Sequence, residues 1–344
     1  MATASKAIAV IGGGGYVGSA LVPELLRRGY RVKVLDLFLF GETIYGDSQH
    51  HPQLSCVKVD IRNEAALHQE LKGQEAVIHL ACISNDPSFE LDPVVGKSIN
   101  YDAMPGFLRA VRACGIRRMI YASSSSVYGV KEEPDVREEA VCQPLTDYSK
   151  FKLICEQMLA SENLGDTEYV ILRPATVCGY ATRLRLDLTV NILTIHALVK
   201  KEITVFGGSQ LRPNIHIQDM VEAYLTVLEA PAAKIHKQIF NVGYNNMAVE
   251  AIARLVRKQL KDESIQIRVQ PANDLRSYHV NSDKIRSVLG FQARHSIEDA
   301  VESIAQAFRA GRIPEPLTRP DYYNIKVIQS SQLKNPQTLA TRLP

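Results

Sequence analysis

The chain has 344 residues, of which 46% are hydrophobic and 22% are charged, and its formal net charge is +3. This composition excludes a wholly disordered chain, and the length allows one large α/β domain or two interlocked ones. A net charge this small gives no reason to expect a nucleic-acid partner, but it is compatible with small ligands that carry phosphate groups.

Six cysteines are scattered along the sequence without a CxxC pair or the spacing of metal ligands. Most lie in apolar contexts, which is typical of small buried hydrophobic residues, so no metal site is predicted. The first residues lead directly into an apolar strand and leave no room for a signal peptide, and no apolar stretch approaches about 20 residues. The sequence therefore predicts a cytoplasmic protein without a membrane partner.

The first half of the chain alternates short apolar runs with amphipathic stretches. Strands are predicted at 7–12, 31–37, 54–61, 76–81 and 168–177, and a further strand starts at 117 and runs into a loop. Helices are predicted at 16–29, near 100–114 and around 148–163. Strands separated by helices favour βαβ units, so we expect the α/β class with a Rossmann-type, doubly wound parallel sheet.

After about residue 180 the pattern loosens. Helices are predicted at 188–201, 218–230 and 247–260, with short strands at 203–208 and 238–244. We expect residues 1–180 to form the cofactor-binding domain and residues 181–313 a smaller α/β lobe for the substrate, with the chain crossing between them. Residues 314–344 are rich in Pro, Gln, Asn and Thr, which predicts an irregular tail or an arm that contacts another subunit.

Gly12, Gly15 and Gly18 follow the first predicted strand and open the first predicted helix. Glycines there permit a tight turn and a close approach of the backbone to a pyrophosphate, which then lies at the positive end of the helix. Asp36 closes the second strand, where a carboxylate can bind both ribose hydroxyls and repel a 2′-phosphate. NAD is therefore predicted rather than NADP. The alternatives are a plain strand–helix turn and an aspartate that caps the next turn.

Two further groups of residues fall at the ends of later strands, where open α/β sheets bind ligands. Asp60 and Ile61 end the third strand and suit the edge of the adenine. Leu80, Ala81 and Cys82 end the fourth strand, and we expect them to pass beneath the middle of the cofactor.

Tyr148 and Lys152 lie four residues apart on one face of a predicted helix. A phenol is a poor base because its ordinary pKa is about 10, but a nearby ammonium and a positive nicotinamide favour the phenolate. Tyr148 is therefore a candidate general base in one direction and a general acid in the other. The serine run 123–126 ends the fifth strand and can orient a substrate hydroxyl. The alternatives are a surface helix pair and a serine-rich turn.

The sequence contains the following motifs in this order: GGGGYVG, Asp36, HLAC, SSSSVYG, Tyr148-x-x-x-Lys152, LRPATVCG and RPNIHIQDMVEA. In this order and spacing they resemble the extended short-chain dehydrogenases/reductases. Within that group the chain is similar to the NAD-dependent nucleotide-sugar epimerase/dehydratase family typified by UDP-galactose 4-epimerase. The resemblance covers residue 6 to roughly residue 310.

The resemblance implies roles for individual residues. Ser124 matches the catalytic Ser/Thr, Tyr148 the catalytic base and Lys152 its partner, which also holds the nicotinamide ribose. Asn100 falls where family members place an asparagine near the active-site backbone. Further cofactor contacts are expected from Tyr16, Val17, Ser123, Pro174 and Val177. Substrate contacts are expected from Ser84, Ser124, Ser125, Thr176, Asn191, Arg212 and Arg276.

The last three of these substrate residues match positions that typically hold the nucleotide diphosphate. Arginine suits this role because its planar head offers several donors to phosphate oxygens. The alternative for Arg212 and Arg276 is a salt bridge on the surface or between lobes.

The chain also departs from the family's patterns. Dehydratases usually carry an acidic residue just after the catalytic Ser/Thr, where this chain has Ser125 and Ser126, so elimination of water is disfavoured. The cysteine typical of GDP-mannose 3,5-epimerases in this loop is missing. Thr176 replaces the asparagine of UDP-galactose 4-epimerase-like enzymes. Arg183 and Arg185 add two cations before Asn191, either as part of a diphosphate or sugar site or as a solvated loop.

These features predict an NAD-dependent enzyme that epimerises a nucleotide-diphosphate sugar, at C4 and through a transient 4-keto sugar. The alternative is a nucleotide-sugar 4-dehydrogenase or 4-ketoreductase, which uses the same three catalytic residues. A non-catalytic NAD-binding protein is disfavoured because Ser124, Tyr148 and Lys152 are all present. The resemblance also implies a homodimer through the two helices next to the active-site strand.

Overall fold

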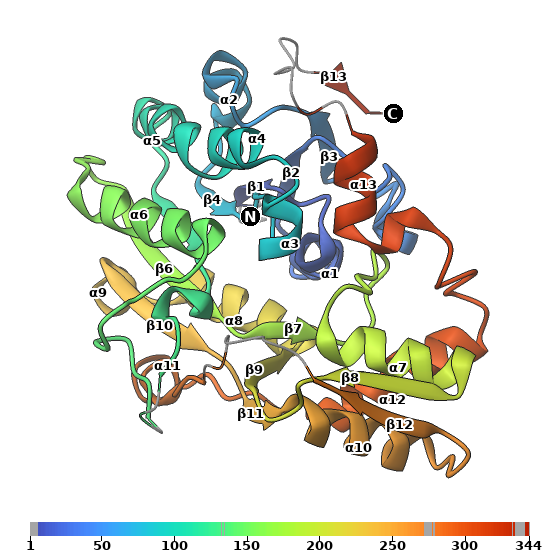
Figure 1. Cartoon of the computed structure of the whole chain (residues 1–344). Coiled ribbons are helices and arrows are strands. Elements are labelled where there is room, and N and C mark those ends of the chain that lie inside the picture. Colours follow the sequence, from blue (N-terminus) through green and yellow to red (C-terminus); the bar gives the residue numbers. More distant parts are fainter. Residues whose placement is uncertain are drawn as a thin grey trace.

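The computed structural model describes residues 6–131, 133, 135–271, 277, 279–331, 333 and 341–343. In this part of the chain, a central sheet carries helices on both faces and a smaller group of helices and strands lies beside it (Figure 1). Within the described residues the central sheet has eight strands, in the order β10-β6-β5-β4-β1-β2-β3-β13. The strands are β1 (Ala7–Ile11), β2 (Arg31–Asp36), β3 (Leu54–Lys58), β4 (Ala76–His79), β5 (Arg118–Ala122), β6 (Glu168–Pro174), β10 (Gln238–Val242) and β13 (Thr341–Arg342).

Neighbouring strands of this sheet run parallel, apart from the antiparallel pair of β13 and β3. The predicted doubly wound parallel sheet is thereby confirmed. The strand order reverses direction between β1 and β4, because β2 and β3 extend one way from β1 and the later strands extend the other way. Open α/β sheets bind their ligands at this kind of switch point, beyond the carboxyl ends of the strands.

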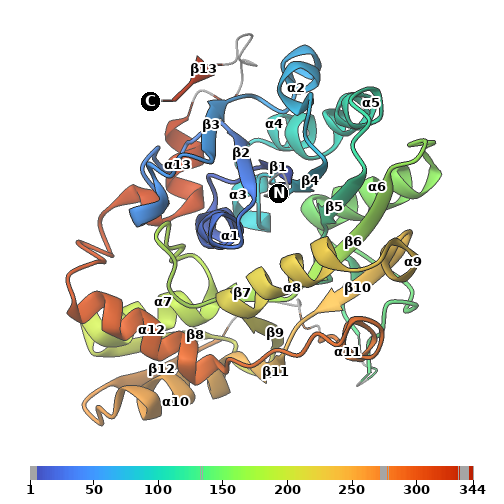
Figure 2. The same ribbon diagram turned by 180° about the vertical axis from the view of Figure 1, so that it is seen from behind.

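Both faces of the sheet are buried, which explains why the strands read as continuous apolar runs. Along β1, Ile8 and Val10 pack into one hydrophobic cluster, whereas Ala9 and Ile11 pack into another. The first face is covered by α1 (Tyr16–Arg27) and α8 (Ile217–Glu229), which Figure 2 shows in front of the sheet. The second face is covered by α2 (Glu64–Leu71), α5 (Met104–Ala113) and α6 (Asp147–Ser161).

The smaller group of elements follows β6 in the sequence. It contains a sheet of β7 (Thr176–Cys178), β9 (Leu211–His216) and β11 (Asn245–Ala248), and a pair of β8 (Glu202–Phe206) and β12 (Gln266–Gln270). Packed against these strands are α7 (Thr189–Lys200), α10 (Val249–Leu260) and α12 (Ile297–Arg309). β10 returns to the central sheet beside β6. The domain boundaries at 180 and 313 and the homodimer stay predictions.

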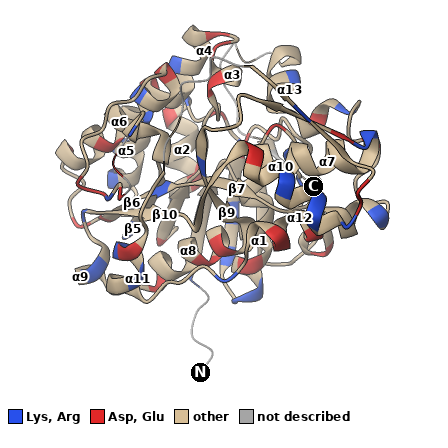
Figure 3. Cartoon of the chain, turned by 60° about the horizontal axis from the view of Figure 1, so that its bottom comes forward, with Lys and Arg blue, Asp and Glu red and all other residues tan. Residues whose placement is uncertain are grey.

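Short helical elements connect these strands and helices: η1 (Gly46–Ser48), α3 (Asp86–Phe89), α4 (Pro93–Lys97), η2 (Ser98–Asp102), η3 (Ser125–Tyr128), α9 (Ala232–Ile235) and α11 (Asp283–Leu289). Figure 3 shows basic and acidic residues interspersed over the outer helices. Among the described residues, no helix combines the length and the apolar character needed to cross a membrane.

The structure differs from the sequence-based expectation at the C-terminal end. Residues 314–344 were expected to be irregular, but the described part forms η4 (Pro320–Tyr322), α13 (Asn324–Ser330) and β13. Val327 and Leu333 are buried, and β13 pairs with the edge strand β3. The polar composition concealed this order because a few well-spaced apolar side chains are enough to dock such a segment on the sheet edge.

A buried ion pair joins α6 to β6. Arg173 of β6 and Glu156 of α6 are each about 3% exposed, and their side chains form hydrogen bonds of 2.6, 3.0 and 3.3 Å. Glu156 also accepts a hydrogen bond from Ser123, just after β5. Arg173 donates a further bond of 2.8 Å to the hydroxyl of Tyr128, which ends η3. The pair therefore fixes α6 and the serine-rich loop relative to the sheet.

The variant Arg173→Met is expected to lower the free energy of unfolding by about 3–5 kcal/mol, because it leaves the Glu156 carboxylate buried without its cation. Urea unfolding followed by circular dichroism measures this loss. The control is Arg137→Met, since Arg137 is about half exposed and pairs with exposed aspartates. This control is expected to change the stability by less than about 1 kcal/mol. Equal losses in the two variants would contradict the role given to the buried pair.

Candidate active site

A cavity of about 370 Å³ lies at the carboxyl ends of the central strands. Most residues that the sequence singled out line this cavity. From the predicted cofactor residues these are Gly12, Gly15, Tyr16, Val17, Gly18, Asp36, Asp60, Ile61, Leu80, Ala81, Cys82, Ser123, Tyr148, Lys152, Pro174 and Val177. From the predicted substrate residues they are Ser84, Ser124, Ser125 and Thr176. One cavity thus brings together strand ends that are far apart in the sequence.

The glycine-rich loop forms one wall and has the geometry of a dinucleotide site. Gly12 has a φ of +79°, and a Cβ at this position would overlap backbone atoms of Ala81. A Cβ at Gly18 would overlap the backbone of Gly13. Gly15 is the N-cap of α1 and has no side chain, so the first turn of the helix offers its backbone N–H groups to a ligand. These residues fit the pyrophosphate of a dinucleotide.

Asp36 ends β2 at the same wall. Its carboxylate accepts hydrogen bonds from the backbone N–H groups of Gly14 (2.8 Å) and Phe38 (2.7 Å), which fix its orientation. Burial raises the pKa of the Asp36 carboxyl, and these backbone donors oppose the rise. Each carboxylate oxygen has a remaining lone pair for a ribose hydroxyl, whereas a 2′-phosphate would meet a like charge.

Tyr148 and Lys152 lie in the first two turns of α6, where Thr146 and Ser149 form a capping box that fixes the helix start. Lys152 is buried, and its Nζ donates a 2.7 Å hydrogen bond to the carbonyl oxygen of Ala122 at the end of β5. Both side chains line the cavity. The capping box and this hydrogen bond therefore hold the pair at the sheet's carboxyl edge.

The Ser124 hydroxyl meets Tyr148 from the serine-rich loop. It lies 2.8 Å from the Ser126 hydroxyl, and Ser124 and Tyr148 both line the cavity. Burial raises the pKa of the Tyr148 phenol well above its ordinary value, whereas the charge of Arg185 and the Ser124 hydroxyl lower it. One cavity is thus lined by a phenol, a serine hydroxyl and a lysine ammonium group.

Asn100 lies beneath the cavity and does not line it. Its side chain donates to the carbonyl oxygen of Ile83 (2.9 Å) and accepts from the N–H of the same residue (2.8 Å). These two hydrogen bonds fix the loop after β4, so Asn100 positions the backbone that the cofactor would contact. Ser123 reaches the cavity, but its hydroxyl is already bonded to Glu156.

Asn191 is fully buried and lies outside the residues that line the cavity. Its side-chain oxygen accepts from the N–H of Gly179 (3.0 Å), and its amide nitrogen donates to the carbonyl oxygen of Arg185 (2.8 Å) and to the Tyr16 hydroxyl (3.2 Å). In this structure Asn191 therefore shapes the loop between β7 and α7. Arg212 on β9 also lies outside the cavity lining, and Arg276 lies outside the described residues.

Other cavity residues carried no clear signal in the sequence. They are Leu37, Leu39, Phe40, Ile83, Asn85, Asp86, Ile99, Tyr224, Asn324, Ile328 and Leu333. Asn85 and Asp86 come a few residues after the HLAC motif, so their place after a strand end could have indicated them. Asn324 comes from α13, more than 130 residues after the loop of Arg183 and Arg185 that it contacts, and nothing in its local sequence points to the cavity.

A family model described as the NAD dependent epimerase/dehydratase family matches residues 8–243, which is more than half of the chain. The chain belongs to this family. It is an NAD-dependent enzyme of the extended short-chain dehydrogenase/reductase class, as the motifs predicted, and NAD is confirmed as the cofactor of the family.

Relatives and solved structures agree with this assignment. The UDP-glucose 4-epimerase of Lactobacillus helveticus is 26% identical over 322 residues, with 87% of this chain and 95% of the relative covered. Two solved structures share the fold. The dTDP-glucose 4,6-dehydratase of Streptomyces venezuelae, with NAD bound, has a TM-score of 0.82 at 20% identity and covers 91% of this chain and 100% of its own. The UDP-glucose 4-epimerase of Thermotoga maritima, with UDP-glucose, has a TM-score of 0.78 at 23% identity and covers 89% and 99%.

The variant Asp36→Asn is expected to weaken NAD binding about tenfold or more and to reduce the preference for NAD over NADP. The variant loses the negative charge that strengthens the two hydrogen bonds to the ribose hydroxyls, so NAD binds less tightly. It also loses the charge that repels a 2′-phosphate, so NADP is excluded less strongly. Titration of cofactor-free protein with each dinucleotide measures both effects. Asp47→Asn, on the exposed η1, is the control and should change neither affinity. An unchanged NAD/NADP ratio in Asp36→Asn would argue against this role.

Proposed function

We propose that this enzyme epimerises a nucleotide-diphosphate sugar at C4 through a transient 4-keto sugar, with NAD bound throughout. The observation that carries the proposal is the convergence of Ser124, Tyr148 and Lys152 in one cavity with the glycine-rich loop and Asp36. The relatives named UDP-glucose 4-epimerase support both the sugar-nucleotide substrate and the C4 position.

In this proposal Tyr148 takes the proton from the C4 hydroxyl while the C4 hydride passes to the nicotinamide. Ser124 hydrogen-bonds the same hydroxyl, and the Lys152 ammonium stabilises the phenolate. Return of the hydride to the opposite face of the 4-keto sugar, with Tyr148 now acting as the acid, completes the inversion. Thr176 lines the cavity at the start of β7 and is a candidate contact for the sugar.

Elimination of water needs an acid or base beyond the tyrosine. Ser125 and Ser126 follow Ser124, and a serine hydroxyl is a poor acid or base at neutral pH. Among the described residues, Asp36, Asp60 and Asp86 are the carboxylates that line the cavity. Asp60 pairs with Arg62, and Asp86 accepts a 2.6 Å hydrogen bond from Thr146 of the α6 cap. These engagements support epimerisation over dehydration.

The test is to incubate the purified protein, without added cofactor, with UDP-, GDP-, dTDP- and CDP-hexoses and to follow the sugar stereochemistry by NMR. We expect C4 inversion of one sugar, which also identifies the nucleotide. Accumulation of a keto sugar, reduced nicotinamide on the protein or a need for added cofactor would support the 4-dehydrogenase or 4-ketoreductase alternative instead.

The variant Tyr148→Phe is expected to abolish turnover, with a loss of at least about 100-fold, because it removes the group that transfers the proton. Bound NAD should remain, since the glycine-rich loop, Asp36 and the other predicted cofactor contacts are unchanged in this variant. The measurements are epimerisation by NMR and nucleotide content after denaturation. Tyr244→Phe, at a half-exposed tyrosine outside the cavity, should retain activity. An active Tyr148→Phe enzyme would defeat the mechanism.

A further inference from the structure

Two arginines of residues 183–187 (RLRLD) are buried and line the cavity. Arg183 and Arg185 are 4% and 8% exposed, and both line the cavity from the loop between β7 and α7. Arg185 pairs with Asp187 through Nε (2.6 Å). The Nε of Arg183 is buried without a hydrogen-bond partner, and burial lowers the pKa of this side chain to about 9. A buried cation is energetically costly unless a negative charge lies close to it. This loop has two buried arginines and pairs one of them with Asp187, so it can accept a further anion.

The two arginines stand at different points along the cavity. Arg183 stacks on the ring of Phe40 (3.7 Å to the centroid), in the loop after β2, and its charge reaches the Asp36 carboxylate. Arg185 donates to Ser84 after β4, at 2.9 Å to the hydroxyl and 3.3 Å to the carbonyl oxygen, and its charge reaches Tyr148. The two cations therefore contact the segments that follow β2 and β4, the strands on either side of β1.

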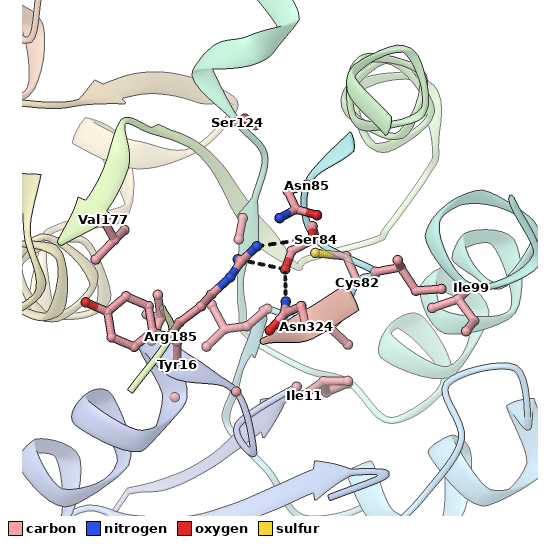
Figure 4. Close-up of a pocket in the computed structure, with 18 of the residues that line it drawn as sticks. Ile11, Tyr16, Cys82, Ser84, Asn85, Ile99, Ser124, Val177, Arg185 and Asn324 are labelled. Atoms are coloured by element: carbon pink, nitrogen blue, oxygen red, sulfur yellow. Dashed lines mark hydrogen bonds between the residues drawn. The ribbon is translucent and has the colours of Figure 1, made fainter. Parts of the chain in front are cut away.

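A dinucleotide that lies between Asp36 and Tyr148 has its pyrophosphate in this middle region, above the first turn of α1. The arginine loop is anchored to the same helix, since the N–H of Arg183 donates to the Ser19 hydroxyl (3.2 Å) and the Tyr16 hydroxyl donates to Gly179 (2.5 Å). Figure 4 shows Arg185 extending across the cavity toward Ser84. The loop thus provides a wall opposite the glycine-rich turn.

The C-terminal segment closes this wall. Asn324, at the start of α13, donates to the Ser84 hydroxyl (2.9 Å), as Figure 4 shows. Its side-chain oxygen also accepts a hydrogen bond from Arg183. Its backbone N–H donates to Asp187 (3.2 Å), the partner of Arg185. Beyond it, Ile328 and Leu333 line the cavity, and β13 then pairs with β3. In Figure 1, α13 lies beside α3 at the β3 side of the sheet.

We propose that Arg183 and Arg185 bind the pyrophosphate of NAD from the side opposite the glycine-rich loop, and that Asn324 holds this second wall closed so that the cofactor stays resident. Guanidinium groups suit a pyrophosphate because they offer paired donors to its oxygens. The two cations also match the two negative charges of the pyrophosphate, and Asp187 offsets part of the repulsion between the two arginines. The inference rests on the proposed function in one respect: a reaction without net redox change has no need to release NAD.

The test compares the whole protein with the variants Arg183→Gln and Arg185→Gln. Gel filtration followed by denaturation and chromatography measures bound NAD(H) per chain, and isotope-labelled NAD measures the rate of exchange. The parent is expected to keep its cofactor through gel filtration. Each Gln variant is expected to lose it and to exchange NAD at least about tenfold faster, because a charged contact to phosphate is lost. Arg→Lys variants should lie between, and Asn324→Ala should speed exchange without removing a cation.

Two controls separate the alternatives. Arg137→Gln, at an exposed ion pair, should retain NAD like the parent. Arg212→Gln, at a position that the resemblance assigns to the sugar nucleotide, should weaken binding of UDP, GDP, dTDP or CDP while NAD retention stays unchanged. Circular dichroism and thermal unfolding with and without added NAD establish that each variant is folded and whether NAD still stabilises it.

The proposal is overturned if folded Arg183→Gln and Arg185→Gln exchange NAD at the parental rate. If these variants instead lose affinity for the nucleoside diphosphates alone, the arginines serve the substrate, which also overturns it. These binding measurements need no turnover. If the protein inverts none of the sugars but the variants change NAD exchange as expected, the result counts against the proposed reaction. It still supports the binding of the NAD pyrophosphate by Arg183 and Arg185.

Discussion

The site depends on the buried pair of Arg173 and Glu156. Glu156 lies on the helix that carries Tyr148 and Lys152. It accepts a hydrogen bond from the hydroxyl of Ser123, in the loop that carries Ser124. Arg173 ends the neighbouring strand and also reaches Tyr128, whose hydroxyl donates to Asn241 of β10. Four elements are therefore held by one charged network in a low-dielectric interior, where a satisfied network is rigid and a broken one is costly. This network therefore positions Ser124 and Tyr148, the proposed catalytic residues, relative to each other.

The other half of the site is held by backbone rather than by charge. Gly12 and Gly18 allow the turn after β1 to pack against Ala81 and Gly13 at distances that a side chain would forbid. The same close packing brings the N-terminal end of α1 to the cavity. Because the proposed cofactor-binding half rests on backbone contacts and the proposed catalytic half on a side-chain network, substitutions in the two halves are expected to have different effects. Loss of a glycine disturbs binding, whereas loss of the ion pair disturbs both folding and the geometry of catalysis.

The sequence predicted the parts of the fold and site that local pattern determines. The apolar strand runs, the glycine spacing, Asp36 and the Tyr148–Lys152 pair each follow from residue chemistry at a strand end or on a helix face, and the structure brings them to one cavity. Asn324 was not predictable, because its role comes from contacts with Ser84 and Arg183 that are distant in sequence. A local pattern also cannot tell a buried asparagine that holds its own loop from one that faces a ligand, and Asn191 holds its own loop.

The C-terminal segment forms part of the cavity wall through Asn324, Ile328 and Leu333. A Rossmann sheet by itself presents its cofactor site as an open crevice, and dehydrogenases that exchange NAD with solution need that opening. Here the Arg183–Arg185 loop and α13 meet over the crevice through Asn324 and Asp187, and β13 ties the far end of the segment to the sheet edge. Such closure slows release of a ligand more than it changes the contacts of the reacting groups. It therefore favours a chemistry in which the nicotinamide is reduced and reoxidised on the same substrate, since that cycle never requires the crevice to open for the cofactor.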